Sequence, residues 1–370
     1  MTTPTRHAVE ALLTGIATAP DPHTLFADAS TRLRRLAPFD AAVWVATDPI
    51  NGLTTAPVRV ENLHEGGCGT YWESELLAEH VNRFRDLARA PVPVAGLRAV
   101  TAGDPGRSPL YRNFMRPRGF EDELRAVFRV DGQPWGQLSL FRARGRADFD
   151  AADFALVQAL GTPLAQRLRS FVQSAATPTP EDTPRAPGML LFDAGGNLVS
   201  LNDEARHLLD QMPPGPTTST PLGIDIPLPV WILSTAGRAR LTGGSARIRI
   251  RAGTGHWLVC HASCLRAAEG SGDSTALVIE PAKPSEVAAL VTAAFELTGR
   301  ELDVLDLIAR GLPTRDIAAQ LHLSPHTVRD HVKAVFDKVG VTSRGELVAR
   351  LFTEFQQPFV ARHTVRVERN

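Results

Sequence analysis

The sequence predicts a multi-domain chain in which two α+β domains precede an all-α domain of four short helices. Its 370 residues exceed the usual size of one domain. Alternating strand patterns are confined to the first 282 residues, whereas residues 295–356 carry only short helical patterns. Residues 175–187 hold four prolines among Thr, Asp and Glu, a composition that cannot form a core and is typical of a linker.

The C-terminal helices are predicted by start and stop signals between Leu297 and Phe352. Ser and Thr occupy positions where a helix N-terminus needs a capping side chain. Pro occupies the first position of a helix, where its missing N–H group costs no hydrogen bond. Gly311 and Gly340 follow two of the apolar-periodic runs, at the left-handed position that ends many helices. The start signals are a capping box of Thr298 and Glu301, Thr314 after Pro313, Ser324 before Pro325, and a second capping box of Ser343 and Glu346.

The third of these helices has two different faces. Four valines fall within about 40° of the first of them on a helical wheel and form an apolar stripe: Val328, Val332, Val335 and Val339. The opposite face carries polar side chains and little apolar bulk: His326, Asp330, Lys333 and Asp337, flanked by Thr327, Arg329 and Ala334. After the tight turn His322-Leu323, this helix suits a helix-turn-helix that reads base edges in a major groove. An ordinary amphipathic helix in a small bundle explains the periodicity equally well.

Residues 295–356 resemble the LuxR-type DNA-binding domain of bacterial transcription regulators. The family usually has Thr-Val-Lys where this chain has Thr327-Val328-Arg329, which keeps the charge but changes its geometry. The resemblance is long and free of gaps, and it is carried by Leu297, Thr298, Arg300, Glu301, Val304, Leu305, Ala309, Gly311, Ile317, Ala318, Leu321, Ser324, Thr327, Val328, His331, Lys338, Val341, Ser343 and Arg344.

The resemblance implies that double-stranded promoter DNA is the partner and that the protein is a homodimer, since two-fold operators call for two-fold proteins. The base-reading side chains would be His326, Arg329, Asp330 and Lys333, with Thr327 beside them. Phosphate contacts would come from Thr314, Arg315, Lys338, Arg344 and the helix N-terminus at Ser324. The fourth helix would carry the dimer contact through Leu347, Val348 and Leu351.

The charge of the chain leaves a second function open. Forty Lys and Arg balance forty Asp and Glu, and residues 295–356 hold eight basic against nine acidic side chains. Because neutralisation of phosphates drives non-specific DNA binding, a near-neutral domain is poorly suited to it. The alternative is a protein-interaction scaffold or signalling adaptor whose four-helix unit binds protein.

The first domain is expected over residues 1–174. A hairpin around Asp131-Gly132, followed by a closing helix, resembles the end of a GAF domain. That helix repeats apolar residues every three or four positions, which favours packing on its own sheet over a helical dimer seam: Val157, Leu160, Leu164, Leu168 and Phe171. The other expected elements are helices over 7–17, 23–36 and 71–89, strands over 40–47, 55–62, 124–130 and 135–142, a loop over 91–117, and the closing helix from 150 or 151 to 172.

The second domain is expected over residues 188–282. Strands over 189–192 and 198–201 precede a helix, 203–209, that is capped by Asn202, an order that resembles the opening of a PAS domain. Strands over 246–251, 256–265 and 275–280 fit its closing. Residues 213–229 are rich in Pro, Thr and Gly where PAS domains carry short helices around a ligand, so no cofactor is predicted.

Catalytic and metal sites are not predicted. The chain lacks a Walker A loop, GxGxxG, HExxH and GxSxG. His256, Cys260, His261 and Cys264 are close in sequence, but four residues along a strand span about 13 Å, too far for one zinc ion. Buried thiols are the favoured interpretation of the two cysteines.

The remaining segments complete the predicted organisation. Residues 283–294 are expected to form a connecting helix, and residues 357–370 a tail. No signal peptide or membrane-spanning stretch is apparent, and three cysteines fit a reducing cytoplasm. The sequence therefore predicts a cytoplasmic transcription regulator whose N-terminal domains receive a small-molecule or protein signal and control DNA binding.

Overall fold

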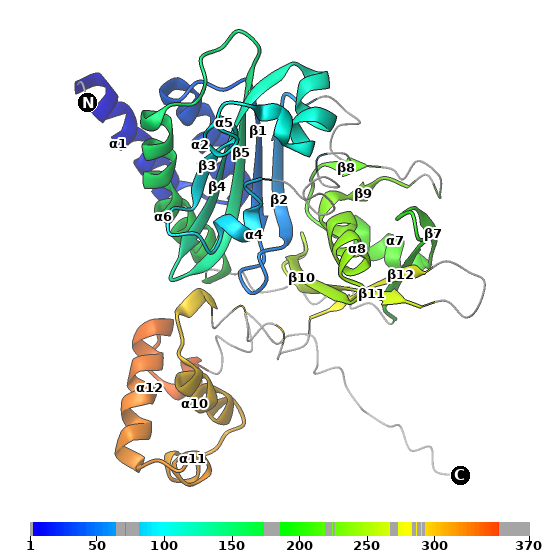
Figure 1. Ribbon diagram of the computed structural model, residues 1–370. Coiled ribbons are helices and arrows are strands. Elements are labelled where there is room, and N and C mark those ends of the chain that lie inside the picture. The colour runs from blue at the N-terminus through cyan, green and yellow to red at the C-terminus, as the bar shows by residue number, and fades with distance from the viewer. Residues whose placement is uncertain are drawn as a thin grey trace.

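The chain folds into two antiparallel α+β sheets and a C-terminal helical unit (Figure 1). The computed structural model describes residues 3–63, 71, 81–173, 186–218, 224, 226–266, 273–282, 286, 290 and 293–347. Most of the predicted linker and the whole predicted tail lie outside these residues. Both sheets have five strands, and both place their own strands in the spatial order two, one, five, four, three.

The first sheet is covered on one face by three helices: α1 (Thr3–Thr18), α2 (Pro22–Leu36) and α6 (Ala151–Gln173) (Figure 1). Asp21 caps α2 by accepting hydrogen bonds from the backbone N–H groups of His23 and Thr24. The strands run in the order β2-β1-β5-β4-β3, with β1 Ala41–Thr47, β2 Thr54–Glu61, β3 Val94–Gly96, β4 Phe120–Val130 and β5 Gln133–Ala143.

The predicted hairpin and closing helix are confirmed. Asp131 and Gly132 both have positive φ, 51° and 77°, as a two-residue hairpin loop requires, and they join β4 to β5. On α6, Val157, Leu160 and Leu164 are buried, and the helix packs against β4 and β5. The apolar stripe of α6 therefore belongs to the core of the first sheet, as the favoured interpretation had it.

The predicted loop over residues 91–117 was wrong in part, because it contains short elements that show no periodicity. They are β3, α5 (Leu97–Val100), a 3₁₀ turn (Pro105–Arg107), a π-helical turn (Tyr111–Met115) and a further 3₁₀ turn (Arg116–Arg118). Of the helix expected over 71–89, residues 72–80 lie outside the described part, and α4 covers only Phe84–Leu87.

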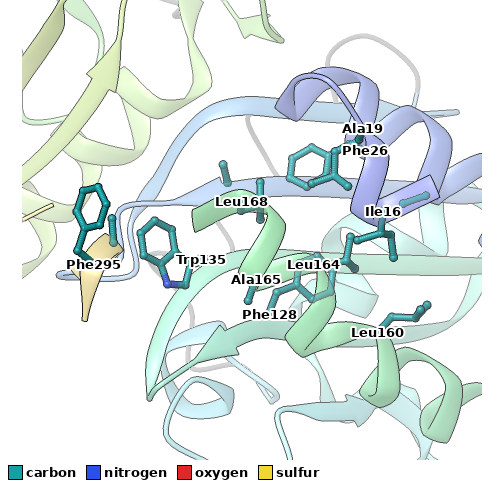
Figure 2. Close-up of a cluster of buried hydrophobic side chains, with 14 of the residues drawn as sticks. Ile16, Ala19, Phe26, Phe128, Trp135, Leu160, Leu164, Ala165, Leu168 and Phe295 are labelled. Carbon is teal, nitrogen blue, oxygen red and sulfur yellow. The ribbon is translucent and has the colours of Figure 1, made fainter. Parts of the chain in front are cut away.

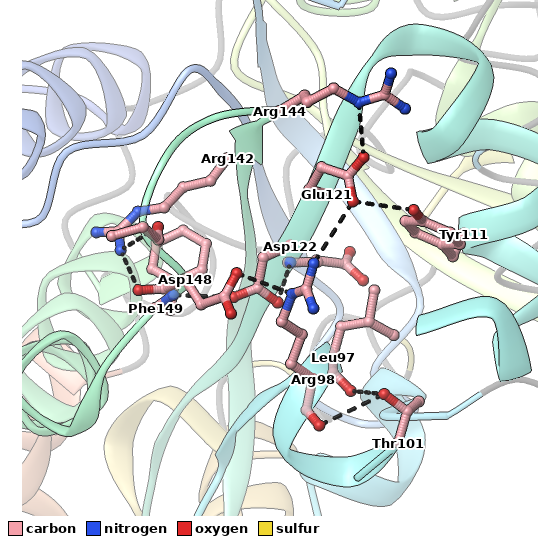
Figure 3. Close-up of polar contacts among 12 residues, drawn as sticks. Leu97, Arg98, Thr101, Tyr111, Glu121, Asp122, Arg142, Arg144, Asp148 and Phe149 are labelled. Carbon is pink, nitrogen blue, oxygen red and sulfur yellow. Dashed lines mark hydrogen bonds and ion pairs between the residues drawn. The ribbon is translucent and has the colours of Figure 1, made fainter. Parts of the chain in front are cut away.

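Polar contacts hold these short elements against the sheet (Figure 3). The carboxylate of Glu121 accepts hydrogen bonds from the Tyr111 hydroxyl at 3.1 Å and from Arg144 at 3.0 Å. Arg98 on α5 pairs with Asp148 at 2.8 Å. The hydrogen bond from Arg144 is the main cause that holds the pKa of Glu121 below its usual range.

The second sheet contains all the strands that were predicted for it. They run in the order β10-β11-β12-β6-β7, and Asn202 caps α7 as expected. The elements are β6 Gly188–Phe192, β7 Leu198–Leu201, α7 Asp203–Asp210, β10 Ser245–Arg251, β11 Trp257–Leu265 and β12 Ser274–Pro281, with a short ribbon of β8 (Thr217–Thr218) and β9 (Leu228–Pro229).

One helix of the second sheet was not predicted. Helix α8 (Val230–Thr242) packs against β10 and β11 on one side and against β2 of the first sheet on another. Val230, Trp231 and Ala236 are buried although they point in different directions around the helix. A helix that is covered on several sides lacks the single apolar stripe by which periodicity detects helices.

A buried ion pair joins the two sheets. The Asp48 carboxylate after β1 accepts hydrogen bonds from the side chain of Arg249 on β10 at 2.8 Å and from its backbone N–H at 3.2 Å. The side chain of Asp48 is fully buried. Burial raises the pKa of Asp48 above its ordinary value, although the positive charge of Arg249 opposes this.

Candidate DNA-binding surface

The helical unit has the helix-turn-helix that the sequence predicts. It contains α10 (Gly299–Ala309), α11 (Thr314–Leu321) and α12 (Pro325–Val339). Residues 322–324 join α11 to α12, and His322 adopts the left-handed conformation with φ 54°. The capping box of Thr298 and Glu301 is present on α10, and the Ser324 hydroxyl caps α12 by accepting from the Thr327 N–H group.

The fourth helix begins where predicted, within the part of the chain that the structure describes. Residues 344–347 are helical, and the Ser343 hydroxyl accepts from the Glu346 N–H group at 3.1 Å. The Glu346 carboxylate bonds to the N–H group and hydroxyl of Thr342, one residue earlier than a capping box requires. Leu347 is buried within the chain, so in this arrangement it offers no surface to a partner. Val348 and Leu351 lie outside the described residues, and the dimer contact stays a prediction.

Helix α12 shows the two faces expected of a recognition helix. Val328, Val335 and Val339 are buried against α10 and α11. The other side of the helix is exposed and carries the four predicted base readers, with His326, Asp330 and Lys333 opposite the stripe and Arg329 at the flank of that face. This face combines donors with acceptors, which is what reading of base edges requires.

Two side chains on this face pair with each other. The Nδ1 atom of His326 lies 3.0 Å from the Asp330 carboxylate, one helical turn away. Arg329 makes a long hydrogen bond of 3.3 Å to the Pro325 carbonyl oxygen. Lys333 has no hydrogen bond or ion pair within the described residues. Asp330 is one of the predicted base readers, and in this structure its carboxylate is paired with His326.

The predicted phosphate contacts lie on three helices. Arg315 on α11 is exposed, as is Ser324 at the start of α12, while Thr314 and Arg344 are half-buried. Ser324 and the first N–H groups of α12 share one end of that helix, where a phosphate oxygen is favoured by the helix dipole. The contacts of these residues with phosphate remain predictions.

Lys338 is engaged inside the helical unit. Its Nζ donates to the Glu301 carboxylate at 2.7 Å and to the Glu296 carbonyl oxygen at 2.9 Å. Burial opposes the ionisation of Glu301, but hydrogen bonds from Lys338 and from Thr298 outweigh it, and the pKa of Glu301 is lowered. Lys338 would have to leave both oxygens to reach a phosphate. The sequence did not reveal the contact between Lys338 and Glu301 because Lys338 lies on α12 and Glu301 on α10.

We therefore expect Lys338→Met to lower the free energy of unfolding of the helical unit by about 1 kcal/mol, since the buried Glu301 carboxylate loses a charged donor. The pKa of Glu301 is depressed in the fold, so this contribution is present at neutral pH and is lost as the pH falls through that pKa. Thermal melts followed by circular dichroism at several pH values measure both effects. Lys333→Met, on the exposed side of the same helix, is the matched control and should not change the melt.

The start of the helical unit is tied to the first sheet. Arg169 on α6 pairs with Glu296 and, at 2.8 Å, with Asp131 in the β4–β5 turn. The Gln173 side chain donates to the Ala294 carbonyl oxygen at 2.7 Å. Phe295 belongs to the same buried cluster as Trp135 and Leu168 (Figure 2). These contacts join segments that are distant in the sequence, and the predicted connecting helix was the only signal for them.

The cysteines of the second sheet do not converge on a metal site. No group of three metal-ligating side chains occurs within the described ranges. Cys260 is fully buried, and Cys264 lies 3.5 Å from the Ala239 carbonyl oxygen. Burial strongly raises the pKa of the Cys260 thiol. Cys68 lies outside the described residues.

A protonated, buried thiol should be inert, because the thiolate is the reactive form. We expect Cys260 to react with Ellman's reagent only after unfolding. The measurement is the thiol count of wild type and Cys260→Ala with and without denaturant. The variant should match wild type when folded and lose one thiol when unfolded, whereas a lower count in the folded variant would contradict the burial of this side chain.

Among the helices that the structure describes, none has the length and apolar character needed to cross a bilayer.

Comparison with known proteins gives a match for the helical unit. Residues 296–351 match the model of the bacterial regulatory proteins of the luxR family. The response regulator RamR of Streptomyces coelicolor is 45% identical over 62 residues, which are 17% of this chain and 31% of RamR. The transcriptional regulatory protein UhpA of Escherichia coli is 43% identical over 56 residues, 15% of this chain and 29% of UhpA.

The chain thus spans less than a third of the length of these curated relatives. Among solved structures, the GAF domain of a phosphoenolpyruvate-protein phosphotransferase from Coxiella burnetii is similar over 45% of this chain and 94% of that domain, at 16% identity and a TM-score of 0.30. That likeness is too weak to assign a function. The sequence match and the geometry of α10–α12 agree: residues 296–351 match the luxR family, and α11 and α12 within them form a helix-turn-helix.

Proposed function

We propose that this protein is a sequence-specific DNA-binding transcription regulator, and that its two sheets receive a signal that controls the C-terminal helix-turn-helix. The observation that carries the proposal is the exposed polar face of α12 behind a buried stripe of valines, in a segment that matches the luxR family. Such a helix can insert into a major groove and donate to and accept from base edges.

The division of labour within the chain is part of the proposal. Residues 1–174 form a GAF-like module, 188–282 a PAS-like module and 295–356 the DNA reader, with a linker at 175–187, a connecting helix at 283–294 and a tail at 357–370. The order of strands and the Asn202-capped helix support the PAS-like module. The described residues of the connecting segment, Glu286, Leu290 and 293–294, are helical.

We further propose that the protein acts in the cytoplasm as a homodimer on promoter DNA. The two luxR-family relatives are named as regulators, which supports a regulatory role and not an enzymatic one. A dimer places two copies of α12 on one duplex and doubles the positive charge that a nearly neutral domain can bring to the phosphates. The proposed partners are thus a second copy of this chain, promoter DNA and a small-molecule or protein signal.

Selection from a random pool of duplex DNA with the full chain tests this proposal. Enrichment of one motif over several rounds is the expected result. A pool that stays random, while the protein remains folded by circular dichroism, would favour the interaction scaffold, to which the near-neutral charge of residues 295–356 points. A two-fold symmetric motif would support the dimer, and a single half-site would count against it.

A further inference from the structure

A cavity of about 530 Å³ lies where the first sheet, the second sheet and the connecting segment meet. Its walls come from α6, from the strands β1 and β2, and from the turn between β10 and β11. The apolar part of the lining includes Leu168, Phe171 and Val172 of α6 together with Leu290 of the connecting segment. This volume lies in the range of small-molecule sites, and an apolar lining with a few polar groups is typical of them.

Three polar groups of the lining have no hydrogen-bond partner among the residues that the structure describes. They are the indole N–H groups of Trp135 and Trp257 and the hydroxyl of Thr254, and all three atoms are buried. Buried polar atoms are nearly always hydrogen-bonded in folded proteins. As the side chains stand, these two N–H donors and the hydroxyl are closed off from the cavity space, so a ligand that carries acceptor oxygens would satisfy them only if its binding turned the side chains toward it.

The charged side chains Asp21, Asp48, Arg249 and Arg251 of the lining all have partners within the protein. Asp48 and Arg249 form the buried ion pair between the sheets, and the Asp21 carboxylate caps α2. Arg251, which donates to the Gly255 carbonyl oxygen, and His23 complete the charged lining. The lining of the cavity is thus neither strongly positive nor strongly negative. The lining therefore suits a molecule with a mainly apolar body and at most one negative charge.

The walls of the cavity also hold the segment that leads to the DNA-binding unit. Leu168, Phe171 and Val172 of α6 line the cavity. In the same turns of α6, Arg169 pairs with Glu296, and Gln173 donates to the Ala294 carbonyl oxygen. Arg249 lines the cavity and donates to the Glu286 carbonyl oxygen at 2.8 Å. A molecule that shifts α6 or β10 would therefore move the residues that position the helical unit.

We propose that this cavity is the effector site of the protein, and that it binds a compact molecule with an apolar ring or chain and a carbonyl or carboxylate oxygen. Its occupancy changes DNA binding through α6 and the connecting segment. The binding half of the proposal rests on the cavity and the polar groups of its lining, whereas the regulatory half rests on the proposed function in DNA binding.

Calorimetric titration of the full chain tests the binding half. The probes are indole-3-acetate, salicylate and octanoate, each beside its uncharged amide, so that a carboxylate requirement is separated from a general carbonyl requirement. We expect at least one pair to show saturable binding with one site per chain. Absence of saturable binding for all six probes would overturn the proposal.

Variants of residues in the lining show whether the probe binds in this cavity. Trp257→Phe and Thr254→Val keep the shape but remove a donor, and each should weaken the bound probe about fivefold, which corresponds to one hydrogen bond. Trp44→Phe is the matched control, because the Trp44 N–H group is also buried without a partner in the described part of the chain but is not in the lining. Equal losses in all three variants would place the probe elsewhere.

A bulky side chain gives a second check on location. Val172→Trp adds volume at the cavity wall and should abolish probe binding, whereas Gln166→Trp, on an exposed position of the same helix, should leave it unchanged. Circular dichroism confirms that both variants are folded. Probe binding that survives Val172→Trp in the folded protein would contradict the assignment.

The regulatory half is tested with a selected DNA duplex. A saturating probe should change the dissociation constant for that duplex by about fivefold or more, a usual size for coupling between two sites. Arg169→Ala cuts the contact with Glu296 and should make DNA affinity independent of the probe. If the probe binds but DNA affinity is unchanged in wild type, the site is not regulatory. If no duplex is ever selected, the proposed function fails while the calorimetric result still stands.

Discussion

Replacing Asp48 with alanine is expected to lower the free energy of unfolding by about 3–5 kcal/mol, the usual cost of leaving one partner of a buried ion pair without the other. Arg249 would keep its charge in a nearly inaccessible position, with the Glu286 carbonyl oxygen as its one remaining hydrogen-bond acceptor among the residues that the structure describes. The Asp48 side chain also accepts from the backbone N–H groups of Ile50 and Arg249, which would lose a partner. Urea unfolding followed by tryptophan fluorescence measures the loss.

Two further variants separate the ion pair from general damage. The double variant Asp48→Ala with Arg249→Met removes both charges and should recover part of the loss, because a buried pair can be replaced by apolar groups at little net cost. Asp306→Ala breaks the pair between Asp306 and Arg310, whose side chains are 59% and 60% exposed, and should have no measurable effect. A double variant less stable than Asp48→Ala would show that the pair is not the source of the stability.

Removing Arg329 and Lys333 together should abolish most of the base preference of the protein. Each base contact contributes about 1–3 kcal/mol of discrimination, so the double alanine variant should bind the selected duplex and its single-base variants with nearly equal affinity. Both side chains are exposed on α12, with Lys333 opposite the buried valines and Arg329 at the flank of that face. Fluorescence anisotropy with the selected duplex and its single-base variants, at two salt concentrations, is the measurement.

Arg315→Ala and Arg310→Ala provide the comparison. Arg315 is a predicted phosphate contact, so its removal should weaken binding to all sequences alike and lower the salt slope by about one. Arg310 is an exposed arginine on the C-cap of α10 outside the predicted DNA face, and its removal should change neither quantity. If Arg315→Ala alters base preference while the double variant lowers all affinities equally, α12 does not have the predicted orientation.

Much of the fold follows from local signals in the sequence. Ser324, Thr298 and Gly340 act at the ends of their helices as predicted, because a cap depends on neighbours within one turn. The Asp131-Gly132 hairpin and the strands of the second sheet also follow from local alternation. Helix α8 was missed, since it is buried between two sheets that are distant in sequence and so has no single apolar face.

Part of the candidate DNA-binding surface could also be predicted from the sequence. The two faces of α12 follow from its 3.6-residue period, which holds for any helix. The engagement of Lys338 with Glu301, and of Arg169 with Glu296, depends on how separate elements pack, and no spacing in the sequence encodes it. The cavity beside Trp135 and Trp257 is likewise built from segments more than a hundred residues apart.

The most direct test of the central claim, that α12 reads bases in a major groove, is methylation interference on the selected duplex. Dimethyl sulfate marks N7 of guanine, which faces the major groove, and N3 of adenine, which faces the minor groove. We expect methylation of guanine N7 within the selected motif to prevent binding by the wild-type protein, and to have less effect on the Arg329→Ala, Lys333→Ala variant. Interference confined to adenine N3, or identical patterns for both proteins, would contradict the assignment of α12 as the recognition helix.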